Sequence, residues 1–191
     1  MNVYDFDGTI YDGESTFDFY LYCVFHHPVC IKFAFIVLKS LIRYKMCRID
    51  EKELMSLAER YICEFLSCCP DARELSVKFW DRKIKKIQPF FLENRQEDDI
   101  IVSASFGFLL RPLFERLGIK HYLLSEIDFD SVSVIRLCYR KNKVRLFRES
   151  YGCIKVCDVY TDSLNDKALM SLAGRDVYLV KHGRVRKYIQ E

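Results

Sequence analysis

The sequence contains little glycine and little proline, seven and four residues among 191. Tight turns depend on these two residues, so their scarcity argues against an all-β chain. Long apolar runs are missing too: the longest lies around Val29–Ile42, and Lys32 and Lys39 interrupt it. As a helix this segment would span ~21 Å, which is short of the ~30 Å hydrocarbon core of a bilayer. We therefore expect no transmembrane helix.

The sequence also lacks an excess of either charge. Thirty Lys and Arg face 27 Asp and Glu, for a net charge of +3 and a pI of about 8.3. Nucleic-acid-binding domains usually have a pI above ~9 and a clustered basic face, so we expect no nucleic-acid partner. The chain opens MNVYDFDGTI, with acidic residues where a signal peptide has a basic segment. A cytoplasmic protein is the expectation.

Cysteine is abundant, but the patterns that would give it a role are missing. The nine cysteines are odd in number and irregular in spacing, with no C-x-x-C pair and no Cys/His quartet at zinc-site spacing. We expect mostly buried, reduced thiols, as in cytosolic proteins. The histidines match no ligand or triad spacing and are expected at the surface or in packing: His26, His27, His121 and His182.

Half of the residues are apolar, enough to bury a sizeable core. A first strand is predicted at 2–6, and a block without any glycine follows from about 17 to 88. Asp50 and Asp71 each precede a Glu by three residues, the pattern of a helix N-cap with a capping box. The block is predicted to hold four helices, at 16–26, 29–45, 50–67 and 71–87.

After Pro89 the chain alternates between strand and helix patterns. Helices are predicted at 107–117, at 143–149 and from the end of 161–163 through Ala173, where Gly174 ends the helix. The further strands are predicted at 100–102, 119–124, 131–139, 156–160 and 177–180, with a turn at Gly183.

This alternation predicts an α/β fold with a Rossmann-like, mostly parallel sheet covered on both faces. The helical block of about 70 residues between the first two strands is too long for a simple crossover, so it is predicted to be an inserted four-helix cap. The predicted division is a core of 1–13 and 89–191 and a helical cap of 14–88.

Polar motifs follow several predicted strands, at the edge where open α/β sheets place their active sites. Asp5 and Asp7 stand two residues apart, so on a strand both side chains face one way, and Gly8 lets the chain leave the sheet abruptly. Ser103 follows the strand 100–102. The segment 161–166, TDSLND, follows the strand 156–160. Taken singly, each motif could equally be a turn or a helix N-cap.

Together the motifs resemble those of the haloacid dehalogenase-like (HAD) superfamily over the whole chain, in the family's order. DFDGT at 5–9 resembles the first motif, Ser103 the second, Lys143 the third and TDSLND the fourth. The helical insertion directly after the first motif resembles the phosphoserine-phosphatase-like subgroup. A Cys-x-Gly-x-x-Lys-Val pattern is common there. Arg140 replaces its glycine here, which leaves Lys141 as an alternative to Lys143.

The resemblance implies a Mg²⁺-dependent phosphatase that hydrolyses a phosphate monoester. Asp5 is implied to be the nucleophile that forms an aspartyl-phosphate, and Asp7 the acid and base. Ser103 and Lys143 would contact the phosphoryl group, which Gly8 and Thr9 would help to cradle. Metal ligands would come from Asp5, the backbone carbonyl of Asp7 and Asp162, while Asp166 supports the metal shell or Lys143.

Two substrate classes stay open, a small phosphorylated metabolite such as phosphoserine and a lipid phosphate. Glu14 and Ser15, at the start of the helical block, are candidates to face the substrate. The predicted helix 29–45 is basic and apolar, consistent either with a solvated helix of the cap or with peripheral membrane contact. The alternative to an enzyme is a HAD-derived binding or scaffold module that has lost catalysis. The oligomeric state is left open.

Overall fold

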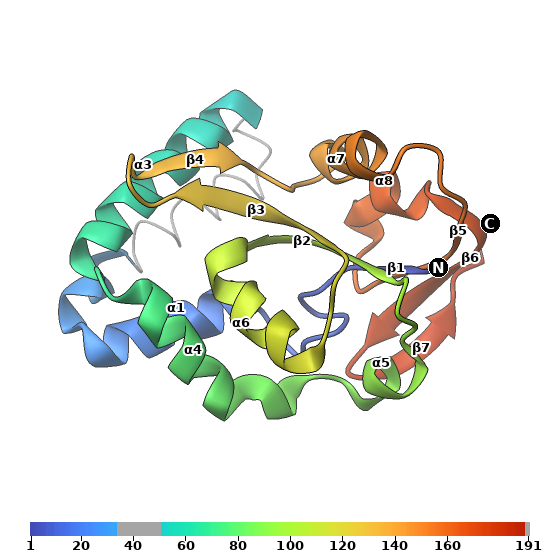
Figure 1. Cartoon of the computed structure of the whole chain (residues 1–191), viewed down its shortest axis with the longest axis horizontal. Coiled ribbons are helices and arrows are strands. Elements are labelled where there is room, and N and C mark those ends of the chain that lie inside the picture. The colour runs from blue at the N-terminus through green and yellow to red at the C-terminus, as the bar shows by residue number, and fades with distance from the viewer. Residues whose placement is uncertain (34–50, 190–191) are drawn as a thin grey trace.

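The structure is a computed structural model that describes residues 1–33 and 51–189. A seven-stranded sheet organises it, in the order β4-β3-β2-β1-β5-β6-β7 (Figure 1). The inner strands pair in parallel, and the two edge strands pair antiparallel with their neighbours. The strands are β1 (Val3–Tyr4), β2 (Ile100–Phe106), β3 (Tyr122–Asp128), β4 (Ser133–Arg136), β5 (Val156–Thr161), β6 (Ala173–Lys181) and β7 (Arg184–Lys187).

The short first strand lies at the centre of the sheet. β1 pairs with β2 on one side and with β5 on the other. The strands β2–β4 therefore extend the sheet on one side of β1, and β5–β7 extend it on the other. Such a switch point leaves a crevice at the carboxyl ends of the strands, where open α/β sheets bind their ligands. A ligand site is therefore expected at the residues that follow β1.

Side chains alternate between the two faces of the sheet, as the two-residue period of a strand requires. One face packs on α5 (Pro89–Asn94), α6 (Gly107–Leu117) and the helical block, through side chains that include Tyr4, Ile101 and Leu124. The other face packs on α7 (Lys141–Tyr151) and α8 (Lys167–Met170), through Val3, Ile100, Val102 and Leu123. The predicted α/β class with a mostly parallel sheet is confirmed.

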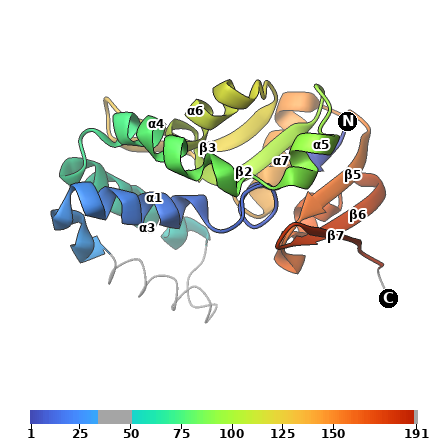
Figure 2. The same cartoon turned by 90° about the horizontal axis from the view of Figure 1, so that it is seen from below.

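The helical block gathers at one end of the molecule, away from β5–β7 (Figures 1 and 2). Its described helices pack on one another and on the β3–β4 edge, where the Cys63 thiol donates to the carbonyl of Val132 over 2.7 Å. They are α1 (Ser15–His26), η1 (Pro28–Ile31), α3 (Glu51–Cys68), α4 (Ala72–Lys83) and η2 (Ile84–Lys86).

The chain enters and leaves the helical block side by side. Tyr11 and Ile87 form an isolated antiparallel bridge, the Asp12 amide donates to the Lys86 carbonyl over 2.9 Å, and the Gln88 amide donates to Ile10 over 2.8 Å. A paired entry and exit fit a helical cap bounded near 13 and 88. The division into core and cap stays a prediction.

Several boundaries differ from the expectations. β2 runs through Phe106, so Ser103 lies inside the strand rather than after it. The helix expected to end at Gly174 stops at Met170. Gly174 instead belongs to β6, where an added Cβ would lie 2.7 Å from the Val156 carbonyl. Only a glycine lets these two strands approach so closely. The short elements α5 and β7 carried too little pattern to be expected.

Predictions within 34–50, including most of the helix 29–45 and the N-cap Asp50, lie outside the described residues. Asp71 does begin α4, but its side chain makes no capping hydrogen bond. The described cysteines are all free thiols, four of them buried and two exposed. Over 1–33 and 51–189, no helix is both long and apolar enough to cross a membrane.

Helix α4 is joined to α6 by hydrogen bonds to backbone carbonyls. Pro112 lacks the N–H that would bond to the Phe108 carbonyl inside α6, and the Ser76 hydroxyl donates to that carbonyl over 3.0 Å. The Trp80 indole donates to the carbonyl of Leu109 over 2.6 Å. The helical block is thereby joined to the helix that supports β2.

Trp80 also supports the loop that follows β1. It is fully buried, with edge-to-face contacts to Phe6 and Tyr11 at ring-centroid distances of 6.3 and 5.6 Å. Trp80→Ala should lower the free energy of unfolding by ~3–5 kcal/mol through a large cavity and a lost hydrogen bond. Phe25→Ala, at a 79% exposed ring, is the control and should change it by less than ~0.5 kcal/mol. Equal losses in urea unfolding would contradict this view of the core.

Candidate active site

Asp5 is the first residue beyond β1, and its side chain is buried between neighbouring strands. Its amide donates to the Tyr160 carbonyl over 2.9 Å, which holds the backbone in the sheet beside β5. Its Oδ1 accepts a hydrogen bond from the Lys143 ammonium over 2.8 Å. Burial raises the pKa of Asp5 to about 7 although Lys143 acts in the opposite direction.

Lys143 is itself buried and lies between two carboxylates. Its Nζ is 2.8 Å from Asp5 Oδ1 and 2.9 Å from Asp166 Oδ2. Burial alone would lower the pKa of Lys143, but the two carboxylates outweigh it and raise that pKa. Lys141, the alternative from the sequence, is exposed, so the geometry brings Lys143 to Asp5.

The start of α7 explains how Lys143 reaches the site. Arg140 precedes this helix with a φ of +46°, in the left-handed region that favours glycine. It occupies the position at which the HAD pattern has glycine. The backbone bend is thus kept without that residue, and two residues after α7 begins, Lys143 points into the core of the site.

Asp7 is held by hydrogen bonds to both carboxylate oxygens. Oδ1 accepts from the Ser15 amide over 2.6 Å, and Oδ2 accepts from the Ser105 hydroxyl over 2.7 Å. Burial raises the pKa of Asp7 above its ordinary value, although these hydrogen bonds lower it. Asp7 is therefore fixed in place, and burial favours its protonated form.

The loop after Asp7 brings the first and fourth motifs together. Gly8 has a φ of +73°, and an added Cβ would lie 2.6 Å from Asp162 Cγ, so only glycine leaves room for that carboxylate. The Thr9 hydroxyl is fully buried, and no group in the described part of the chain hydrogen-bonds to it. A buried polar atom without a partner fits a ligand that supplies one.

Ser103 and Glu14, the two remaining polar candidates, differ in exposure. Ser103 is buried in β2, and its hydroxyl accepts from the Ser105 amide over 3.0 Å. Glu14 precedes α1 and is exposed. Partial desolvation and the charges of Asp7 and Asp162 raise the pKa of Glu14 to about 7. Glu14 is thus the acidic group at the outer rim.

The carboxylates of the site fit a hard divalent cation. Asp162 follows β5, and burial raises its pKa, with Asp166 and Asp7 adding to the effect. Asp5, Asp7 and Asp162 thus stand in a buried region where negative charge is unfavourable. Oxygen ligands of this kind suit Mg²⁺, which would relieve the repulsion between them. Asp166 is engaged with Lys143, consistent with a supporting role.

Two hydroxyl side chains that contact the carboxylates of the site were not among the predicted site residues. Ser105 donates to Asp7, and the Thr161 hydroxyl lies 3.4 Å from Asp166 Oδ2. Both follow from strand periodicity, because Ser105 shares a face of β2 with Ser103 and Thr161 is the last residue of β5. Ser15 meets Asp7 through its backbone amide, which no side-chain pattern indicates.

Comparison with known proteins identifies the family of this chain. The sequence profile of haloacid dehalogenase-like hydrolases matches residues 3–171. The chain belongs to this family. The suspected resemblance is thereby confirmed, and the family match spans all four HAD motifs. No curated protein is significantly similar to the chain in sequence.

Several solved structures share the fold at low sequence identity. A protein of unknown function from Bordetella pertussis Tohama I has a TM-score of 0.69 and 14% identity, over 88% of this chain and 84% of that one. A HAD family hydrolase from Salmonella enterica serovar Typhi has a TM-score of 0.59 and 12% identity, over 90% and 59%. A probable phosphoserine phosphatase from Vibrio cholerae has a TM-score of 0.56 and 14% identity, over 91% and 54%.

Removing the buried ammonium of Lys143 should show how much the carboxylates of the site destabilise the fold when they lack a counter-charge. Lys143→Met, studied in EDTA, should lower the free energy of unfolding by ~3–5 kcal/mol, because buried carboxylates lose their counter-charge. Without Lys143 the already raised pKa of Asp5 rises further. The folded variant then binds a proton as the pH falls, so its deficit shrinks.

Urea unfolding at about pH 8.5 and about pH 5.5 should therefore give the larger loss at the higher pH. Lys141→Met, two residues earlier and exposed, is the matched control and should stay within ~0.5 kcal/mol of the wild type. A loss that is equal at both pH values, or equal in the control, would contradict the buried contact.

Proposed function

We propose that this HAD hydrolase is a Mg²⁺-dependent phosphatase that cleaves a phosphate monoester through an aspartyl-phosphate on Asp5. The observation that carries the proposal is the buried contact of Asp5 with Lys143, beside an Asp7 that is fixed through both of its oxygens. A module that only binds ligand has no need of a buried nucleophile beside an acid that is held through both oxygens. The same residues argue against the non-catalytic alternative.

In the first step Asp5 attacks phosphorus. Lys143 holds Oδ1, and we assign the attack to Oδ2, which forms the new bond to phosphorus while the ester P–O bond breaks. The cation of Lys143 keeps Asp5 in its carboxylate form and offsets charge on the phosphoryl oxygens. The hydroxyls of Ser103 and Thr9 are assigned to two of those oxygens.

Asp7 is assigned the proton transfers. The Ser15 amide can only donate, so Oδ1 stays an acceptor. The Ser105 hydroxyl can turn toward its other hydroxyl partners and accept instead, so we assign the proton that Asp7 carries to Oδ2. Asp7 gives this proton to the leaving alcohol. In the second step it takes a proton from the water that attacks phosphorus, and Asp5 is regenerated as inorganic phosphate leaves. A carboxyl with a raised pKa suits both transfers.

We assign the metal to the carboxylate of Asp5, the backbone carbonyl of Asp7 and the carboxylate of Asp162. When bound, Mg²⁺ would supply positive charge that offsets the anionic phosphoryl group. Asp166 holds Lys143 in place rather than serving as a direct ligand. The close approach of Asp162 to Gly8 supports its inclusion in this set.

The helical cap is assigned substrate selection, for either a small phosphorylated metabolite such as phosphoserine or a lipid phosphate. The first residues of α1 reach the site, because the hydroxyls of Ser15 and Thr16 lie 3.2 and 2.9 Å from that of Ser105. Movement of this helix would therefore act directly on Asp7. Glu14 at the rim suits contact with a cationic group of the substrate.

Asp5→Asn tests the nucleophile. In Mg²⁺, with a panel of metabolite and lipid phosphates, turnover should fall at least ~10³-fold, because an amide cannot form the acyl-phosphate. Labelled acetyl phosphate should leave an acid-stable covalent label on the wild type and none on the variant. Asp12→Asn, an exposed carboxyl in the same loop, is the control that should keep the label. Undiminished turnover in Asp5→Asn would remove Asp5 as nucleophile, and no label on the wild type would favour the binding module.

Metal removal tests the cofactor. EDTA should abolish turnover and Mg²⁺ restore it, and Asp162→Ala should raise the Mg²⁺ concentration for half-maximal turnover at least ~10-fold. Asn165→Ala, an exposed neighbour three residues later, is the matched control and should leave the Mg²⁺ requirement unchanged. Full turnover in metal-free buffer would defeat the assignment.

A further inference from the structure

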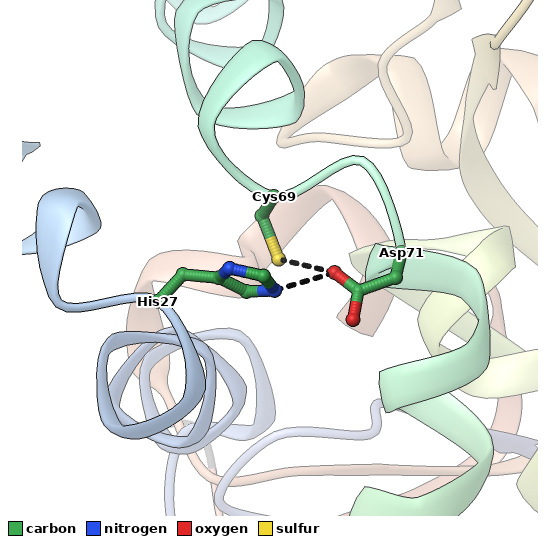
Figure 3. A group of neighbouring side chains, drawn as sticks. All are labelled: His27, Cys69 and Asp71. Atoms are coloured by element: carbon green, nitrogen blue, oxygen red, sulfur yellow. Dashed lines mark hydrogen bonds and ion pairs between the residues drawn. The ribbon is translucent and has the colours of Figure 1, made fainter.

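An imidazole, a thiol and a carboxylate meet in the helical block, in elements other than the strand ends that carry the HAD motifs. His27 Nε2 lies 2.6 Å from Asp71 Oδ1, and Cys69 Sγ lies 3.8 Å from the same oxygen. The three ligand atoms are all within 4.8 Å of one another. Figure 3 shows the side chains pointing toward a common centre, His27 from the end of α1 and the other two from the α3–α4 turn.

Two more thiols lie near Cys69. Cys23 and Cys30 are near enough to Cys69 to shift the pKa of its thiol, and all three cysteines are fully buried. The Cys30 thiol donates to the carbonyl of Cys68 over 3.7 Å. Cys23 stands four residues before His27, whose amide donates to the Cys23 carbonyl over 2.7 Å at the end of α1. A buried cysteine is ordinary as a small apolar residue. A buried thiol that contacts the carboxylate of an imidazole–carboxylate pair is not accounted for by packing alone.

The conformation of Asp71 points the same way. An Asp at the first position before a helix normally accepts a hydrogen bond from the helix amides. Asp71 makes no such bond to α4, and its carboxylate faces His27 and Cys69 instead. The side chains of His27 and Asp71 are 30% and 39% exposed, so a cation could reach them from solvent.

From this juxtaposition we propose that His27 Nε2, Cys69 Sγ and an Asp71 carboxylate oxygen bind a thiophilic divalent cation of the Zn²⁺ class. Zinc takes this mixture of N, S and O ligands, and thiolate selects it over Mg²⁺. As the Cys69 Sγ–metal bond forms, the thiol proton leaves to solvent. The neutral His27 ring then carries its proton on Nδ1, so that Nε2 is free to bind the metal beside Asp71.

Such an ion would be a structural staple of the helical cap. It would join the end of α1 to the turn between α3 and α4, which are distant in sequence. Because the ligands come from already folded segments, bound metal would stabilise the native arrangement by mass action. The site goes beyond the proposed phosphatase function and does not depend on it.

Cobalt substitution tests the site in the full-length reduced protein. One equivalent of Co²⁺ should produce a thiolate-to-cobalt charge-transfer band, which oxygen ligands at the Asp5 site cannot give. One equivalent of Zn²⁺ should abolish the band, and excess Mg²⁺ should leave it. Zn²⁺ should also raise the melting temperature of the wild type. Absence of the band, or a disulfide between Cys23 and Cys69 in place of metal binding, would overturn the proposal.

Matched variants locate the ligands. Cys69→Ser should lose the band, and His27→Gln should weaken Co²⁺ binding at least ~10-fold and remove the thermal shift with Zn²⁺. Cys153→Ser, an exposed thiol, and His26→Gln, an exposed neighbour of His27, should behave as the wild type. If Cys69→Ser fails to fold by circular dichroism, His27→Gln at its half-exposed position decides the outcome. A band unchanged in His27→Gln would overturn the assignment of the imidazole.

The two proposals fail separately. Asp5→Asn should keep the cobalt band, so loss of turnover in that variant says nothing against the metal site in the helical block. His27→Gln should still take up the covalent label from acetyl phosphate. A chain that binds cobalt through thiolate but forms no phosphoenzyme would retain this inference and remove the phosphatase proposal.

Discussion

The buried ammonium of Lys143, held between Asp5 and Asp166, is the contact on which the organisation of the site depends. It joins the end of β1, the start of α7 and the turn after β5, three segments that are far apart in sequence. A buried carboxylate without a partner would be strongly unfavourable. The ion pair forms only where β1 lies beside β5 and where α7 packs on the sheet face that does not carry the helical block.

The loop after β1 meets a second constraint, because aromatic packing and polar positioning act on the same few residues. Phe6 packs against Trp80 of the helical block, while Asp5 and Asp7 turn toward the strand ends. Trp80 in turn donates to Leu109 in α6. The helical block is thus joined to the core both through its apolar contacts and through the Ser15 amide on Asp7. The position of Asp7 therefore depends on where the helical block begins.

Much of the fold follows from local pattern, and the errors occur where pattern is weak. α1, α3 and α6 lie within one residue of their predicted bounds, because apolar periodicity extends over three or more turns. The helix expected to reach Gly174 instead ends at Met170. Gly174 belongs to β6 instead, because the close approach of β5 at this position requires a residue without a Cβ. Asp5 and Asp7 could be recognised because they directly follow a strand, whereas Lys143, in α7, was indicated only by the family resemblance.

The sequence by itself determined the α/β class, the helical block after the first strand and the acidic motifs, since all of these depend on neighbours in the chain. Tertiary structure decided what depends on distant segments. Lys143 rather than Lys141 reaches Asp5 because the bend at Arg140 sets the start of α7. Likewise, His27 meets Cys69 and Asp71 only after α1 packs against the α3–α4 turn, since ligands separated by some forty residues leave no spacing pattern in the sequence.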